Sequence, residues 1–302
     1  MSHSAETVGK RSDGLDLARV ENMLVHDFNF KQHGFVGKMY DVGGEKLLIV
    51  IQGLKGLELP CKYAKLFAEK GYSALAMSYY GSEGLPRKMR AIPLEMFGAA
   101  IGEMKKRGFR KFGIYGNSKG GGIALIAASQ ILDFSLCIAV STTAHIFQGN
   151  GKPRENPCRS MVSYHGKDFP YISNKGLFGR FLKRCLHERK LQILYLIDEW
   201  EKFGSSENEI PVEHIRGEIL LLTAEHDESV PARADAELLM KRLEENHFAY
   251  PHRHVNSKTG SHNLGYYPVN NWVLPREKHY PKECQQARED TLKVILETLH
   301  HF

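Results

Sequence analysis

Short apolar runs alternate along most of the chain with segments that have the period of a helix. Six runs have the continuous apolar character of strands that are covered on both faces of a sheet; they lie at residues 45–53, 72–81, 111–116, 135–142, 218–227 and 250–257. Proline and glycine mark the ends of the predicted helices between them, which lie at 60–70, at 93–108, directly after residue 118, at 232–245 and at 283–300. This alternation predicts an α/β fold with a doubly wound, mostly parallel sheet.

Two segments depart from this pattern. Residues 25–44, "VHDFNFKQHGFVGKMYDVGG", predict an antiparallel hairpin with Gly34 near its turn. Residues 145–217 interrupt the fold between two core strands, and we expect them to form a small helical cap over the carboxyl ends of the strands. With 302 residues and 42% hydrophobic content, the chain is long enough for one large core. We therefore expect a single α/β domain over 1–302 with this insertion.

Composition and charge narrow the classes of protein. The first residues lack the apolar core of a signal peptide, and no apolar run reaches the roughly 20 residues that cross a bilayer. We expect a soluble, cytoplasmic protein without membrane insertion. The five cysteines are odd in number, spread along the chain and without a C-x-x-C pair, which predicts free thiols rather than a disulfide framework or a zinc cluster.

The net charge of +6 permits an anionic partner without requiring one. The densest basic run, Lys105 to Lys111, falls at the end of a predicted helix, where cations offset the helix dipole. No P-loop, zinc-finger spacing or RNA-binding aromatic signature occurs, so we expect no nucleic-acid partner, no cofactor and no metal. The sequence does not indicate the oligomeric state.

The stretch "KFGIYGNSKGGGIALI" at residues 111–126 carries the chemistry. An apolar strand ends in Gly116-Asn117-Ser118-Lys119-Gly120, which has the G-x-S-x-G spacing of a sharp strand-to-helix turn that exposes a serine hydroxyl. An ordinary glycine-rich turn with an idle serine has the same local pattern. The rest of the chain has to decide between these two interpretations.

Partners for Ser118 are expected at the carboxyl ends of other strands, where active sites lie in such sheets. Asp227 ends the run "ILLLTAEHD", and His262 follows the last predicted strand in "TGSHNLGYYP". The order Ser118, Asp227, His262 is the order of a catalytic triad on this fold. Glu225 and Glu228 are the alternatives for the acid, and the pair His252 and His254 fits half-buried positions on one strand face.

The expected oxyanion donors are backbone N–H groups. One is the N–H of Lys119 at the start of the glycine-rich helix, and the second comes from Gly53 or Leu54 after the first core strand. The side chain of Lys119 has no role in this interpretation.

Several quoted segments resemble one known family. "LFAEKGYSALAMSYYGSEGLP", "IPLEMF", "FGIYGNSKGGGIALIAAS", "TGSHNLGYYP" and "AREDTLKVILETL" are similar to the C-terminal α/β-hydrolase domain of the acyl-CoA thioesterase and bile acid-CoA:amino acid N-acyltransferase family, from about residue 45 to the end. The resemblance implies an acyl-enzyme mechanism on thioesters of coenzyme A, with Ser118 as nucleophile, Asp227 as acid and His262 as base. Family members with this activity carry a further N-terminal β-sandwich domain, whereas about 40 residues precede the first core strand here.

The resemblance also bears on the type of reaction. Amino-acid-conjugating members use cysteine as nucleophile, so Ser118 favours hydrolysis over transfer to an amine. Arg180, Lys183 and Arg184 of the predicted cap are candidates to meet the phosphates of coenzyme A, although a solvated helix face explains them equally well. Two other functions stay open: a hydrolase of another bond, such as a lactone (dienelactone-hydrolase type) or a peptide, and a non-catalytic binding protein on the same fold.

Overall fold

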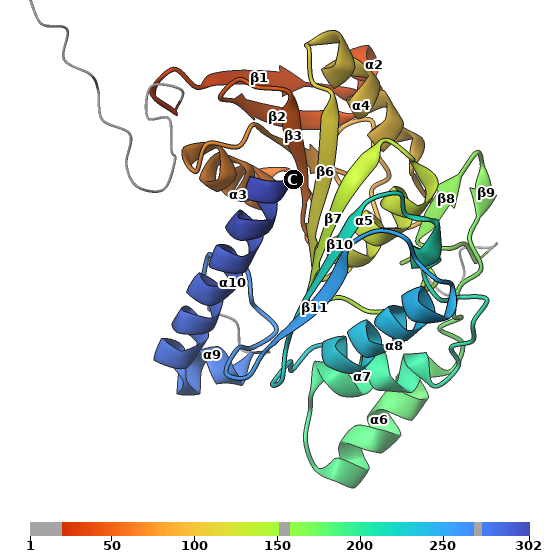
Figure 1. Cartoon of the computed structure of the whole chain (residues 1–302). Helices are drawn as coiled ribbons and strands as arrows, with labels where there is room; N and C mark the ends of the chain where they lie inside the picture. Colours follow the sequence, from red (N-terminus) through yellow and green to blue (C-terminus); the bar gives the residue numbers. More distant parts are fainter. Residues whose placement is uncertain (1–19, 151–157, 269–273) are drawn as a thin grey trace, which may run out of the picture.

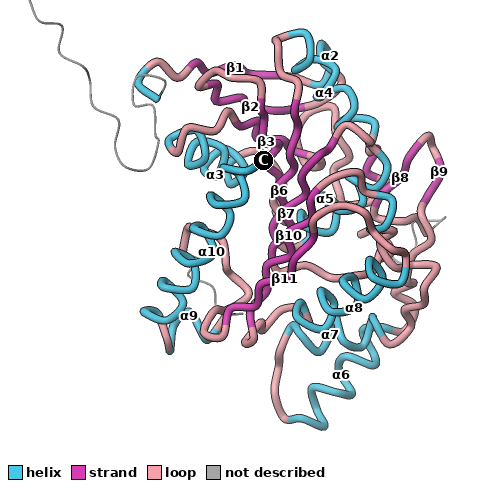
Figure 2. Tube along the Cα trace, viewed as in Figure 1, coloured by secondary structure: helices cyan, strands magenta, loops and turns pink. Residues whose placement is uncertain are grey.

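The computed structural model describes residues 20–150, 158–268 and 274–302. One eight-stranded sheet runs through it, with helices on both faces (Figures 1 and 2). The strands, in their order across the sheet, are β1 (Leu24–Phe28), β2 (Val36–Asp41), β4 (Ala74–Ser78), β3 (Lys46–Ile51), β6 (Lys111–Asn117), β7 (Phe134–Val140), β10 (Glu218–Ala224) and β11 (His252–Ser257).

The sheet is parallel from β4 to β11 and antiparallel at its other edge. β1 pairs antiparallel with β2, and β2 pairs antiparallel with β4. β1 and β2 are therefore the predicted hairpin, with the short helix α2 (Phe30–His33) and the left-handed residue Gly34 between them. All six predicted core strands are confirmed, as is the doubly wound α/β fold.

Helices cover the two faces of the sheet as separate layers (Figure 1). On one face lie α3 (Glu58–Glu69) and α10 (Pro281–His301), with the short α9 (Pro275–His279) before α10; on the other lie α4 (Glu95–Lys106), α5 (Lys119–Gln130) and α8 (Ala232–Glu245). The strand β3 shows why both layers are needed, because Leu47, Ile49 and Ile51 pack into one apolar cluster and Leu48 and Val50 into the other. A strand that is apolar at every position has to be buried on both faces.

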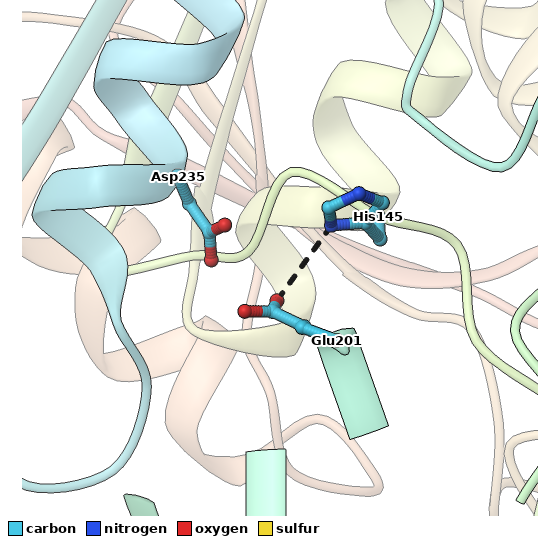
Figure 3. Close-up of side chains that lie close together, drawn as sticks. All are labelled: His145, Glu201 and Asp235. Carbon is cyan, nitrogen blue, oxygen red and sulfur yellow. Dashed lines mark ion pairs between the residues drawn. The ribbon is translucent and has the colours of Figure 1, made fainter. Parts of the chain in front are cut away.

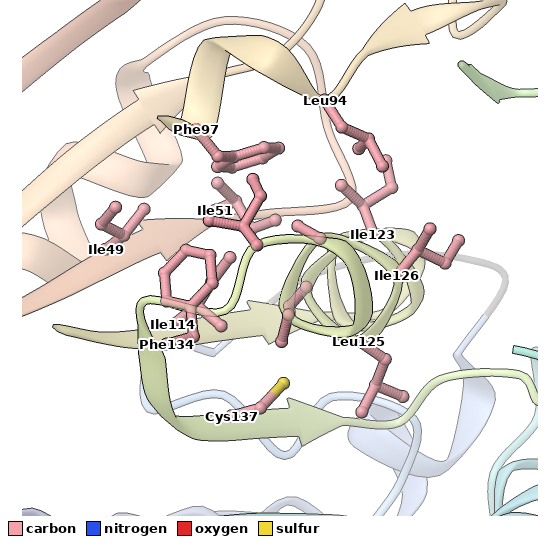
Figure 4. Packing of buried hydrophobic residues seen from close by; sticks show 14 of the residues in the cluster. Ile49, Ile51, Leu94, Phe97, Ile114, Ile123, Leu125, Ile126, Phe134 and Cys137 are labelled. Carbon is pink, nitrogen blue, oxygen red and sulfur yellow. The ribbon is translucent and has the colours of Figure 1, made fainter. Parts of the chain in front are cut away.

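The core around α5 is closely packed. Ile123 and Ile126 of α5 lie near Leu94 and Phe97, above the strands that carry Ile114 and Cys137 (Figure 4). Every residue of α5 from Gly120 to Ser129 is buried, so this helix is apolar on all sides. The residue before it, Ser118, is therefore held on a rigid support.

The segment between β7 and β10 carries its own small elements. They are β8 (Val162–Tyr164), β9 (Lys167–Asp168), α6 (Leu177–Glu188), α7 (Ile193–Glu201) and the 3-10 turn η1 (Val212–His214). β8 pairs with β9 and with β5 (Ile92–Pro93), so this segment forms a second small sheet with the core rather than helices alone. Strands of two or three residues have no readable period, which is why the sequence did not predict this sheet.

None of the described helices combines the length and apolar character that a membrane span needs. The N-terminal residues on which the expected localisation partly depends lie outside the described ranges. The five cysteines are free thiols, as predicted: Cys61, Cys137, Cys158, Cys185 and Cys284.

Candidate active site

Ser118 occupies a strained turn between β6 and α5. Its backbone has φ 55° and ψ −128°, a conformation that residues with a side chain adopt rarely. The flanking glycines are required by space: a Cβ atom on Gly116 would lie 2.2 Å from the carbonyl oxygen of Gly120, and one on Gly120 would lie 2.8 Å from the carbonyl carbon of Gln52. The turn therefore has the tight geometry that the G-x-S-x-G spacing predicts.

His262 and Asp227 lie beside Ser118. The Nε2 atom of His262 is 3.0 Å from Ser118 Oγ, and its Nδ1 atom is 2.9 and 2.8 Å from the two carboxylate oxygens of Asp227. Asp227 follows β10 and His262 follows β11, so three separate strand ends bring the three side chains together. The side chains of His262 and Asp227 are 13% and 3% exposed, which keeps water from competing for these contacts.

The turn after β10 orients Asp227. Its Oδ1 atom accepts hydrogen bonds from the backbone N–H groups of Ser229 (2.8 Å) and Val230 (2.9 Å). The two neighbouring carboxylates point elsewhere: Glu225 binds the Arg233 guanidinium, and Glu228 accepts a hydrogen bond from the backbone N–H of Arg276. Of the three acidic residues in this turn, Asp227 is the one in contact with His262.

A buried polar network holds the loop that carries His262, and the sequence did not indicate it. Ser261 is fully buried and donates a hydrogen bond to the carboxylate of Glu277, which in turn pairs with Arg288 of α10. The backbone N–H of Asn263 donates to Ser261 Oγ at 3.1 Å. These contacts fix the backbone on both sides of His262. Their only sequence signal is the position of Ser261 next to the histidine.

The other histidines considered from the sequence lie away from Ser118. His252 Nδ1 is 2.8 Å from the carbonyl oxygen of Tyr250, and His254 Nε2 is 2.6 Å from Thr223 Oγ1 on the neighbouring strand. Burial lowers the pKa of His254. Both are partnered residues of the sheet edge.

The loop after β3 passes directly beside the serine. A Cβ atom at Gly53 would lie 3.3 Å from both Lys119 N and Ser118 Cβ. The backbone of Gly53 and the first N–H of α5 therefore lie close together. The Leu54 side chain is 66% exposed and belongs to the rim of the same hollow.

A cavity of about 1160 Å³ opens at Ser118 and His262. Its wall combines the core with α7 of the insertion, which contributes Ile193, Leu196, Ile197 and Trp200. This volume slightly exceeds that of common small-molecule sites. The cavity is therefore large enough for a small molecule that reaches the serine.

Lys119 is also part of this wall. The residue is exposed, yet the surrounding protein desolvates the ammonium and lowers its pKa. From the sequence we expected no role for this side chain. The sequence therefore predicted neither its contact with the cavity nor the lowering of its pKa.

The basic residues of α6 are not part of the described cavity wall. The Arg184 guanidinium binds Asp198 at 2.9 Å and lies over the Tyr195 ring, and the Arg180 guanidinium lies 4.2 Å from the centre of the Phe203 ring. These contacts join α6 to α7 and to Phe203, which follows the end of α7. They do not support the expected phosphate role of the α6 arginines.

Exposed lysines of another helix, Lys62 and Lys65 of α3, line the cavity instead.

One group of side chains among the described residues has the composition of a metal site. It consists of His145, Glu201 and Asp235, whose candidate ligand atoms all lie within 4.8 Å of one another. The sequence did not predict it, because its members come from three distant segments.

A mostly parallel sheet that carries a strained serine beside a histidine defines the α/β-hydrolase class of fold. Comparison with solved structures supports this fold. An esterase of Pyrococcus furiosus superposes with a TM-score of 0.52 at 14% sequence identity, over 96% of this chain and 95% of that one. At this identity the likeness concerns the fold.

The particular family follows from sequence comparison. Residues 92–275 match the family model described as "BAAT / Acyl-CoA thioester hydrolase C terminal", and the chain belongs to this family, as the resemblance implied. It is 26% identical over 193 residues to acyl-coenzyme A amino acid N-acyltransferase 2 of Mus musculus, covering 60% of this chain and 40% of that protein. It is 23% identical over 185 residues to the mitochondrial acyl-coenzyme A thioesterase 2 of Mus musculus, covering 60% of this chain and 37% of that protein. The chain thus matches well under half the length of these relatives.

Proposed function

We propose that the protein hydrolyses carboxylic thioesters or esters through an acyl-serine intermediate at Ser118. The observation that carries this proposal is the continuous set of contacts from Ser118 Oγ to His262 and from His262 to Asp227. An idle serine in a glycine-rich turn needs neither a histidine at 3.0 Å nor a carboxylate behind that histidine.

Each residue has one task in this mechanism. His262 accepts the proton of Ser118 as the hydroxyl attacks the carbonyl carbon, and the side chain of Asp227 holds the imidazole in the tautomer that this transfer needs. The oxyanion receives hydrogen bonds from the backbone N–H of Lys119 and from Gly53 or Leu54. His262 returns its proton to the leaving group and then activates a water that releases the acid.

We also propose that residues 145–217 act as a cap and that the substrate is a coenzyme A thioester. The apolar side chains of α7 in the cavity wall suit an acyl chain. The names of the relatives, which include an acyl-coenzyme A thioesterase, support this leaving group. From the sequence alone, we also propose that the reaction takes place in the cytoplasm and needs no cofactor.

A hydrolysis panel tests the substrate class. Purified protein is offered acyl-CoA of short, medium and long chain and the matching p-nitrophenyl esters, and thiol or nitrophenol release is measured. The proposal predicts release of free coenzyme A and free acid, with the medium or long chains preferred because the cavity rewards apolar length. Turnover of the nitrophenyl esters alone contradicts the coenzyme A assignment and leaves the acyl-serine mechanism standing.

Acyl transfer is the second candidate, because a relative is named an amino acid N-acyltransferase. Adding glycine or taurine to the same assay separates the two reactions. Hydrolysis gives only the free acid at all amine concentrations, whereas transfer gives an amide whose yield rises with the amine.

A further inference from the structure

A second histidine–carboxylate group lies in the interior, where the insertion meets the core. His145 follows β7, Glu201 is the last residue of α7, and Asp235 lies in the first turn of α8 (Figure 3). His145 Nδ1 lies 3.8 Å from Glu201 Oε1, which is too long for a hydrogen bond.

These side chains are buried with polar atoms that lack partners. Asp235 is 5% exposed, and the side chains of His145 and Glu201 are 9% and 13% exposed. Three atoms have no hydrogen-bond partner in the structure: His145 Nδ1, Glu201 Oε1 and Asp235 Oδ2. Buried polar atoms are nearly always satisfied, so three unsatisfied atoms around one point require an explanation.

The two carboxylates also lack a basic partner other than the histidine. Among the described residues, the only ion pair that either carboxylate makes is the one between Glu201 and His145. Burial raises the pKa of Asp235 well above its usual range and that of Glu201 to about 7, and it lowers the pKa of His145. Two nearby carboxylates, Asp198 and Glu209, add negative charge, although each is bound by an arginine.

The imidazole is held in place from its other side. A Cβ atom at Gly204 would lie 2.6 Å from His145 Nε2 and 3.0 Å from the carbonyl oxygen of Glu201. The absence of a side chain at Gly204 therefore lets the ring pack against the end of α7. This packing leaves Nδ1 on the side of the two carboxylates (Figure 3).

From this arrangement we propose that His145, Glu201 and Asp235 bind one divalent cation of the zinc class. One imidazole nitrogen and two carboxylate oxygens are ligands that zinc accepts, whereas calcium and magnesium prefer oxygen ligands alone. In a tetrahedral zinc site the ligand atoms lie about 3.4 Å apart, so atoms now within 4.8 Å need to move inward by less than about 1 Å each. A fourth position stays open to water.

The cation would fasten α7 to the core. Glu201 directly follows Trp200, whose ring lines the cavity at Ser118, and His145 lines the same cavity. Binding of the metal therefore stabilises the cavity wall that the insertion supplies. Metal binding at this junction does not depend on which bond the enzyme cleaves.

Metal content tests the proposal directly. Tag-free full-length protein is stripped with a chelator, dialysed against Zn²⁺ and analysed by mass spectrometry of the metal, and its affinity is measured by competition with a chromophoric chelator. We expect one tightly held zinc per chain, a loss of affinity of at least about 100-fold in Asp235→Asn and in His145→Gln, and unchanged binding in Glu244→Gln. Glu244 is an exposed carboxylate on the same helix α8.

If a variant folds poorly, thermal unfolding of the wild type with and without metal still tests the proposal. Zinc should raise the Tm of the wild type by several degrees, and magnesium should not. Equal zinc binding in all variants would assign the metal to surface histidines and overturn the proposal. Absence of tight zinc in the wild type would overturn it too, and would leave Glu201 and Asp235 as a carboxyl pair that shares a proton. Because Ser118→Ala should bind zinc like the wild type, failure of this proposal and failure of the proposed hydrolysis are distinguishable.

Discussion

Asp227 and Asp235 lie eight residues apart, and each places a buried carboxylate near a histidine. Asp227 is saturated: its oxygens accept two backbone N–H groups and contact His262 at 2.8 and 2.9 Å. Asp235 keeps an oxygen without a partner, next to a histidine nitrogen and a glutamate oxygen that also lack one. The side chains of Asp227 and His262 both have hydrogen-bond partners, whereas those around Asp235 include atoms without one.

In the two proposals, this difference gives one pair of residue types two kinds of chemistry. A carboxylate whose oxygens are bound by its own turn can hold an imidazole in one orientation, which is the role proposed for Asp227. A carboxylate that is buried without donors either takes up a proton or binds a cation. The predictions below separate these two behaviours.

The largest effect is expected for Ser118→Ala. Loss of the nucleophile should lower kcat by at least about 10⁴-fold, because what remains is the contribution of binding and the oxyanion donors. The change removes one oxygen, so the Tm should stay within about 2 °C of the wild type. Ser135→Ala, a half-buried hydroxyl on β7, is the matched control and should retain full activity. Equal turnover of both variants would refute the role of Ser118.

A somewhat smaller loss is expected for Asp227→Asn. An amide in this position stabilises the wrong imidazole tautomer, and kcat should fall by about 10³- to 10⁴-fold. Glu225→Gln makes the same chemical change two residues away, where the carboxylate faces Arg233, and should cost less than about twofold. The opposite ranking of the two variants would mean that the acid has been assigned to the wrong residue.

The second group predicts a pH effect on stability in the metal-free protein. Burial raises the pKa of Glu201 from 4.5 to about 7, so the folded state keeps this proton to higher pH than the unfolded state. The corresponding stability is present below about pH 4.5 and is lost as pH rises towards 7. Glu201→Gln does not titrate, so its Tm relative to wild type should rise by about 3 °C or more between pH 5 and pH 8.

Differential scanning fluorimetry with a chelator in every buffer measures this difference in Tm between Glu201→Gln and the wild type. Glu244→Gln, the exposed carboxylate, should show a constant difference from wild type over the same range. A constant gap for Glu201→Gln as well would mean that Glu201 is ionised in the folded protein at all these pH values.

The smallest effect concerns the phosphates of coenzyme A. Lys62 and Lys65 line the cavity and are exposed, each within reach of a glutamate one helical turn away. Reversing both charges should raise the KM for acyl-CoA by about three- to tenfold and leave neutral esters almost unchanged. Lys183→Glu on α6 is the control, because Lys183 is exposed and outside the described cavity wall. A larger rise of the KM for acyl-CoA in Lys183→Glu would mean that the phosphates bind at α6 rather than at α3.

The sequence predicted the elements whose signals are local. Continuous apolar runs located the core strands, and the predicted helix over 232–245 coincides with α8. The tight turn at Ser118 was also predictable, because Gly116 and Gly120 are dictated by contacts a few residues away. Likewise, Asp227 and His262 could be inferred from their positions after strands.

The remaining features depend on contacts between distant segments. The support of the His262 loop by Glu277 and Arg288 joins residues up to 27 positions apart, and the group around His145 joins three segments over 91 positions. Nothing in the local pattern of any one segment indicates such a meeting. The contacts of Arg180 and Arg184 are of the same kind, since their partners Phe203 and Asp198 lie just after or on a different helix.

The central claim is that Ser118 is an activated nucleophile, and covalent labelling tests it most directly. Wild-type protein and Ser118→Ala are incubated with a fluorophosphonate, and intact mass and peptide mapping locate the adduct. The account predicts one adduct per chain on Ser118, slower labelling in His262→Ala because the base is lost, and no adduct in Ser118→Ala. An unlabelled wild type, or an adduct on another residue that persists in Ser118→Ala, would contradict it.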